Sequence, residues 1–84
     1  MTVENWKATL GARMKKARED ADLTQAFIAT DLNVAQTTVS AWERGVAAPR
    51  DDLRPRIAQL LGVAANWLFS YDPDNGDDED GRAA

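Results

Sequence analysis

Short, uncharged hydrogen-bonding side chains are concentrated in residues 36–44 (QTTVSAWER). If this segment is helical, Val39 and Trp42 share one side of it. The other side carries Gln36, Thr37, Ser40, Ala41 and Arg44. A helix face turned to water usually carries Glu and Lys, because Ser and Thr are weaker helix formers. Contact with water alone therefore does not explain the residue types on this face.

Catalytic chemistry has few candidates in this chain. Histidine and cysteine are both absent from its 84 residues. Ser-His and Cys-His catalysis are therefore excluded, as are disulfides and thiolate metal sites. An EF-hand calcium loop needs Gly at its sixth position and Glu at its twelfth. Counted from Asp72, Gly76 falls at the fifth position and Ala83 at the twelfth, so residues 72–83 do not match this motif. We expect no enzyme, no cofactor and no metal site.

Charge divides the chain into two parts. Residues 1–71 hold nine basic and eight acidic side chains, whereas residues 72–84 hold six acidic side chains and one arginine. The second part has no aliphatic residue beyond its last two alanines, so it cannot compensate its ordering entropy. We expect one domain over 1–71 and a disordered acidic tail or linker over 72–84.

No apolar run approaches the roughly 20 residues that span a bilayer. The first residues, MTVENWKATLG, carry Glu4 and Lys7 where a signal peptide needs its hydrophobic stretch. We expect a cytoplasmic protein without membrane contact.

Apolar spacing predicts an all-α fold of five short helices. Their expected ranges are about 4–20, 25–31, 36–44, 53–61 and 64–69. Thr24 is the expected N-cap of the second helix, and Asn33 its left-handed end. Asp52 is the expected N-cap of the fourth, which puts Pro55 at the third helical position. The expected core includes Leu10, Met14, Ile28, Trp42, Ile57, Trp67 and Leu68.

Two segments, LTQAFIATDLNVAQTTVSAWERGVAAP and IAQLLGVAANWLF, resemble the lambdoid-repressor and Cro-like helix-turn-helix family of DNA-binding proteins. The resemblance covers roughly residues 10–69. It implies that residues 36–44 are a recognition helix in the DNA major groove. This role would explain why the exposed face carries Gln, Thr and Ser, because such side chains form hydrogen bonds with base edges.

The resemblance also implies roles for individual residues. The implied base contacts are Gln36, Thr37 and Ala41, with Thr38 and Ser40 as further candidates. The implied phosphate contacts are Gln25, Arg44 and Arg50. Arg18 and Glu43 match an inward ion pair, so their implied role is structural. The alternative for Thr37, Thr38 and Ser40 is an ordinary polar surface, and any surface arginine could resemble Arg44 or Arg50.

Two positions depart from the family pattern. Ala35 stands where the recognition helix usually has a Ser or Thr N-cap, and Phe27 replaces the glutamate of a capping box. We expect Phe27 to be partly exposed.

The function that follows is a sequence-specific regulator of transcription, most simply a repressor, bound to a double-stranded DNA operator as a homodimer. Phe69 and Tyr71 are candidates for the dimer contact, because Trp67 and Leu68 match inward positions of the family. The alternative is a protein-interaction module of the same fold, whose acidic tail contacts a partner or mimics DNA.

Overall fold

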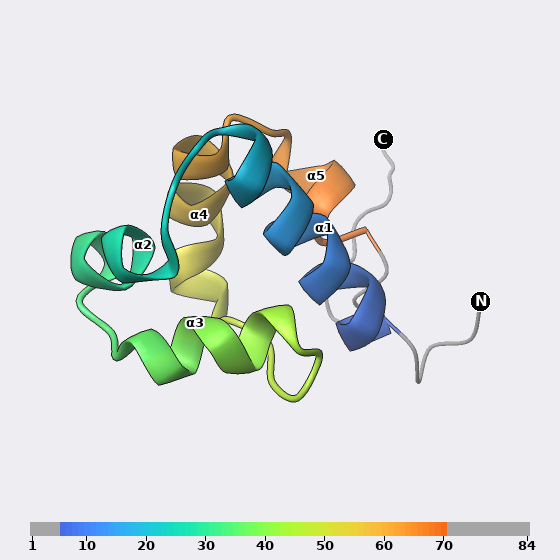
Figure 1. Cartoon of the computed structure of the whole chain (residues 1–84). Helices are drawn as coiled ribbons and strands as arrows, with labels where there is room; N and C mark the ends of the chain where they lie inside the picture. Colours follow the sequence, from blue (N-terminus) through green and yellow to red (C-terminus); the bar gives the residue numbers. More distant parts are fainter. Residues whose placement is uncertain (1–5, 71–84) are drawn as a thin grey trace.

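A computed structural model describes residues 6–70 of the chain. Within this range five α-helices and one short 3-10 helix follow one another (Figure 1). Their bounds are α1 Trp6–Asp20, α2 Gln25–Leu32, α3 Gln36–Glu43, η2 Asp51–Leu53, α4 Arg54–Leu61 and α5 Ala65–Leu68. The all-α fold class is confirmed. The expected start of the first helix, at Glu4, lies outside the described residues.

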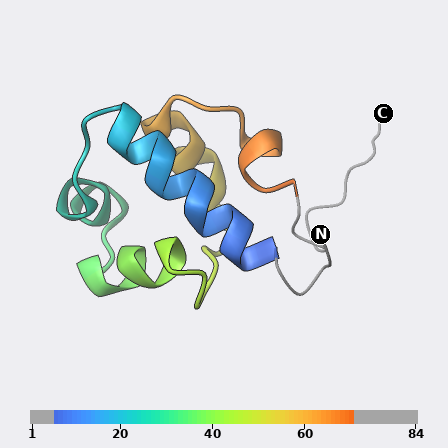
Figure 2. The same cartoon turned by 45° about the vertical axis from the view of Figure 1, so that its right-hand side comes forward.

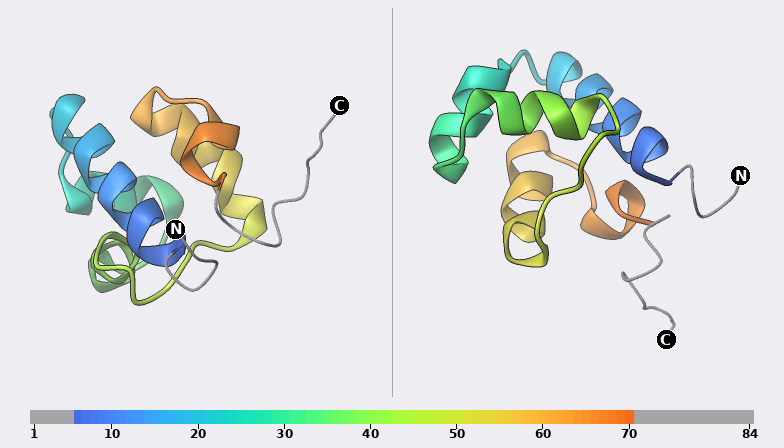
Figure 3. Two further views of the ribbon diagram at one scale, coloured as in Figure 1. Left: turned by 90° about the vertical axis from the view of Figure 1, so that its right-hand side faces the viewer. Right: turned by 90° about the horizontal axis from the view of Figure 1, so that it is seen from below.

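The helices surround one core. α1 contacts α3, α4 and α5, and α2 contacts α3 and α4. The turned views show α3 running beneath α1 and the pair α4–α5 closing the other side (Figures 2 and 3). The largest fully buried side chains come from all five helices or their ends: Leu10, Met14, Ile28, Val39, Ile57, Leu68 and Phe69.

Local signals set the ends of α2 and α4. The backbone N–H of Phe27 donates to the Thr24 hydroxyl at 3.0 Å, so Thr24 is the N-cap of α2 as expected. Asn33 ends α2 in the left-handed region, with φ of 58°. Gly62 ends α4 in the same region, with φ of 70°.

Gly11 brings α1 and α3 into close contact. It is buried in α1, and an added Cβ would lie 2.5 Å from the carbonyl oxygen of Trp42 and 2.6 Å from that of Glu43. Both carbonyls belong to the last turn of α3. Only glycine therefore permits this approach of the two helices.

α4 begins within one residue of the expected start near Leu53, but the expected N-cap is wrong. Asp51, Asp52 and Leu53 form a 3-10 turn, and α4 begins at Arg54 behind Leu53, whose side chain makes no capping hydrogen bond. Asp52 is therefore not an N-cap. Pro55 instead falls within the first two helical positions, where its missing N–H leaves no hydrogen bond unmade.

The expected orientation of the last aromatic residues is also wrong. Trp67 is 43% exposed, whereas Phe69 is 2% exposed and belongs to the core. α5 is only one turn long, and its C-cap Phe69 folds inward, where the Arg54 guanidinium lies 4.8 Å from its ring centroid. Phe69 thus has no outward face for a dimer contact, and Tyr71 lies outside the described residues.

Within residues 6–70 no helix is both long enough and apolar enough to cross a membrane.

Candidate nucleic-acid interface

α2 and α3 are joined by a three-residue turn. The N–H of Val34 donates to the Ala29 carbonyl at 3.0 Å, and partly buried Val34 packs against the core. Ala35 is extended, with φ of −72° and ψ of 148°, and its side chain makes no capping hydrogen bond. The expected lack of a side-chain cap on α3 is therefore confirmed. The turn holds α3 as the second helix of a helix-turn-helix unit.

One face of α3 is open to solvent. Val39 and Trp42 are buried beneath it, which fixes the rotation of the helix. Gln36, Thr37 and Arg44 are exposed, and Ser40 and Ala41 are half-buried. These five residues, which we call the α3 face, follow helical spacing and lie on one side. The structure thus brings together four of the five expected base contacts, together with Arg44.

Thr38 lies apart from the α3 face. It lines a hollow of about 400 Å³ beside the helix, together with Trp42, Arg50 and Leu53. Arg50 is therefore on the flank of α3 that faces η2. Its Nε donates to an Asp52 carboxylate oxygen at 3.2 Å, and both side chains are exposed. An exposed pair of this kind contributes little stability, but it leaves Arg50 beside a carboxylate.

Glu43 is the centre of a buried network on the opposite flank. Arg18 donates to both of its carboxylate oxygens, from Nε at 2.7 Å and from a terminal nitrogen at 3.0 Å. The Glu43 side chain is 3% exposed. Arg18 also donates to the Leu23 carbonyl at 2.9 Å. The hydrogen bond to Glu43 raises the pKa of Arg18 above its ordinary value, which favours the charged guanidinium. The expected inward ion pair of Arg18 and Glu43 is present.

Gln25 joins this network, which the sequence pattern did not indicate. Its side-chain amide donates to Glu43 Oε1 at 3.0 Å. One carboxylate therefore connects α1, α2 and α3. The Gln25 amide nitrogen carries a second hydrogen that this bond does not use.

Arg44 lies at the end of α3, as its C-cap. Its Nε donates to the Ser40 hydroxyl at 3.2 Å, one helical turn earlier. Both residues belong to the α3 face. This contact joins an expected phosphate contact to an expected base contact.

The sequence pattern also did not indicate a bidentate ion pair, because its two residues are 25 positions apart. Arg56 of α4 donates to both carboxylate oxygens of Asp31 in α2, each at 2.8 Å. These hydrogen bonds lower the pKa of Asp31 below its ordinary value. The pair attaches α2 to α4. Phe27, on the same helix, is 50% exposed, as expected.

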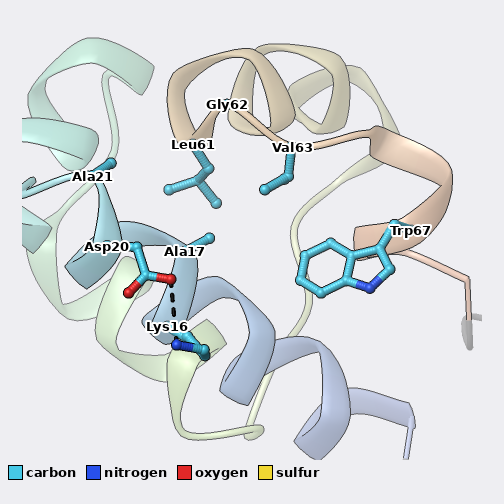
Figure 4. A pocket seen from close by; sticks show the side chains of 8 residues that line it. All are labelled: Lys16, Ala17, Asp20, Ala21, Leu61, Gly62, Val63 and Trp67. Atoms are coloured by element: carbon cyan, nitrogen blue, oxygen red, sulfur yellow. Dashed lines mark hydrogen bonds and ion pairs between the residues drawn. The ribbon is translucent and has the colours of Figure 1, made fainter.

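A second hollow, of about 420 Å³, lies where α1 meets the turn between α4 and α5 (Figure 4). Trp67 forms one wall, and Lys16 and Asp20 form a 3.3 Å ion pair on the other. The Arg13 guanidinium lies 4.6 Å from the Trp67 ring centroid. Arg13 also donates to the Trp67 carbonyl and, at 3.2 Å, to the Ser70 hydroxyl. These contacts explain how Trp67 is held while remaining exposed.

Among residues 6–70 no group of three or more His, Cys, Asp or Glu side chains is placed to hold a metal ion.

Comparison with known proteins agrees with this geometry. A family model described as helix-turn-helix matches residues 14–68. The chain is 33% identical over 64 residues to the HTH-type transcriptional regulator ImmR of Bacillus subtilis, covering 76% of this chain and 50% of ImmR. It is 31% identical over 80 residues to the 26 kDa repressor protein of Escherichia phage HK022, covering 90% of this chain and 34% of the repressor.

A third relative is the HTH-type transcriptional regulator DicA of Escherichia coli, which is 28% identical over 72 residues, covering 86% of this chain and 53% of DicA. The chain thus spans about half the length of ImmR and DicA and about a third of the phage repressor. The matched region contains α2, the turn and α3. The chain belongs to the repressor- and Cro-like helix-turn-helix family.

Proposed function

We propose that this protein is a sequence-specific regulator of transcription, a repressor, that inserts α3 into the major groove of double-stranded DNA. The observation that carries the proposal is the α3 face. Gln36 and Thr37 are exposed near the start of the helix, which is where recognition helices contact base edges. Gln can bond the N6 and N7 of adenine, and Thr can bond a base or pack its methyl on thymine. Ala41 leaves room and offers a methyl contact.

Phosphate contacts would surround this face. Arg44 extends from the C-terminal end of α3, and Arg50 lies on the flank beside Thr38. Gln25 opens α2, where backbone N–H groups point outward at the helix start. Contacts of this kind fix the position of a protein on the duplex without reading sequence.

We propose a homodimer on DNA. α3 has eight residues and is therefore about 12 Å long, so it covers only a few base pairs. Two copies on half-sites one helical turn apart would double the number of bases read. The names of the relatives, two transcriptional regulators and a phage repressor, support the regulatory role.

A salt titration tests the proposal. Binding of the chain to a random-sequence duplex pool is measured at several salt concentrations. We expect log affinity to fall linearly with log salt, because phosphate contacts release counterions. A protein-interaction module of the same fold would show no salt-dependent duplex binding, and that result would overturn the proposal.

A further inference from the structure

The arginines of the described residues differ in their partners. Arg18 contacts Glu43, and Arg56 contacts Asp31. Arg54 contacts Asp51 at 3.5 Å, and Arg50 contacts Asp52. Each of these four charges is thus balanced by a carboxylate.

Arg44 differs from these four arginines, because its hydrogen-bond partner is the neutral hydroxyl of Ser40. Its positive charge is therefore not compensated by that contact. It is exposed and lies at the end of the helix that carries the α3 face. The Arg44 guanidinium at the end of α3 can therefore bind an anion.

The contact with Ser40 also fixes which part of Arg44 is available. Ser40 lies four residues earlier, so the two side chains share one face of α3. The 3.2 Å bond uses Nε, which leaves the two terminal nitrogens of the guanidinium for another partner. Two parallel N–H groups match two oxygens of a phosphate. A long, flexible side chain held by one hydrogen bond also loses less freedom when it binds.

We propose that Ser40 is a positioning residue that directs Arg44 at a DNA phosphate, rather than a base contact. The proposal rests on the proposed function and deepens it. It assigns Ser40 a role different from those of Gln36 and Thr37. It also identifies Arg44, rather than Arg50, as the main phosphate-binding arginine near α3, because a phosphate at Arg50 would lie against the Asp52 carboxylate.

A double-mutant cycle tests this. Affinity is measured for wild type, Ser40→Ala, Arg44→Ala and the double variant, on a random duplex pool and on the duplex enriched from it by selection. We expect Arg44→Ala to reduce the steepness of the salt dependence by about one. We expect Ser40→Ala to weaken binding about three- to tenfold on both duplexes, and only while Arg44 is present.

Ser40→Thr is the matched control, because it keeps the hydroxyl, and its affinity should stay near that of wild type. Melting temperatures of all variants should stay close to that of wild type, because Arg44 is exposed and Ser40 is only half-buried, so neither substitution empties a core position. A loss from Ser40→Ala that is the same with and without Arg44 would overturn the positioning role. A loss confined to the selected duplex would make Ser40 a base contact and would also overturn it. A wild type that fails to bind duplex DNA at all would instead overturn the proposed function.

Discussion

Arg18 and Glu43, 25 residues apart, meet through two hydrogen bonds of 2.7 and 3.0 Å at the junction of α1 and α3. Gln25 adds a third bond to the same carboxylate. The relationship explains why a charged residue stands at the last position of α3 and yet faces inward. It fixes the end of α3 against the two preceding helices.

Glu43→Ala should therefore destabilise the fold. Its removal leaves the Arg18 guanidinium largely buried without its partner, which typically costs about 3–5 kcal/mol. Urea unfolding measures the loss. Gln25→Ala is the control, because it removes one hydrogen bond and should cost only about 0.5–1.5 kcal/mol. A Glu43→Ala variant that unfolds like wild type but no longer binds DNA would place Glu43 in the interface instead.

Gly11→Ala should also destabilise, although alanine favours helix. The new Cβ would meet two carbonyl oxygens of α3 at 2.5 and 2.6 Å, so the helices must separate. Overpacking of this kind costs about 1–3 kcal/mol. Ala12→Gly, at an exposed position of the same helix, reports the propensity difference alone, about 1 kcal/mol. Greater stability of Gly11→Ala in thermal unfolding would show that α1 and α3 are not in close contact here.

Truncation should destabilise the fold much more at Phe69 than at Trp67. Phe69→Ala empties a fully buried position and should cost about 3–5 kcal/mol. Trp67→Ala removes a half-exposed ring whose main partner is Arg13, and should cost about 1 kcal/mol. Chemical denaturation compares the two variants. Equal costs would mean that the orientation of α5 differs from the one described.

Asp31 should give the fold a pH dependence at low pH. The hydrogen bonds from Arg56 lower its pKa in the folded state, so the ionised pair stabilises the fold above the ordinary carboxylate pKa. This contribution is lost as the pH falls through the lowered pKa. Asp31→Asn removes the titration, so its stability difference from wild type should shrink between about pH 7 and pH 2.5. A difference that stays constant over this range would contradict the role of the pair.

Local features of the fold were predictable from sequence because they depend on neighbouring residues. Thr24 caps α2 through a hydrogen bond three residues away, and Asn33 supplies the left-handed residue after it. The burial of Trp42 and the rotation of α3 follow from helical spacing. The Arg18–Glu43 pair was expected only through family resemblance, since its partners are distant in the chain.

Other features depend on how the helices meet, which spacing does not reveal. Nothing near Gly11 in sequence indicates that α3 crosses there, and the Asp31–Arg56 pair requires α2 beside α4. The inward assignment of Trp67 came from matching family positions, and α5, a single turn, is too short for a periodic pattern to correct it. Likewise, Asp52 has the character of an N-cap, yet the backbone forms a 3-10 turn at that point.

If α3 reads bases as we propose, Gln36→Ala should change specificity more than general affinity. Affinity of wild type and variant is measured at one salt concentration for the selected duplex and for the random pool. Gln36 is exposed at the start of α3, and loss of a bidentate base contact costs about 1–3 kcal/mol. We expect that loss on the selected duplex and almost none on the random pool. An equal loss on both duplexes, or a selection that enriches no sequence, would contradict it.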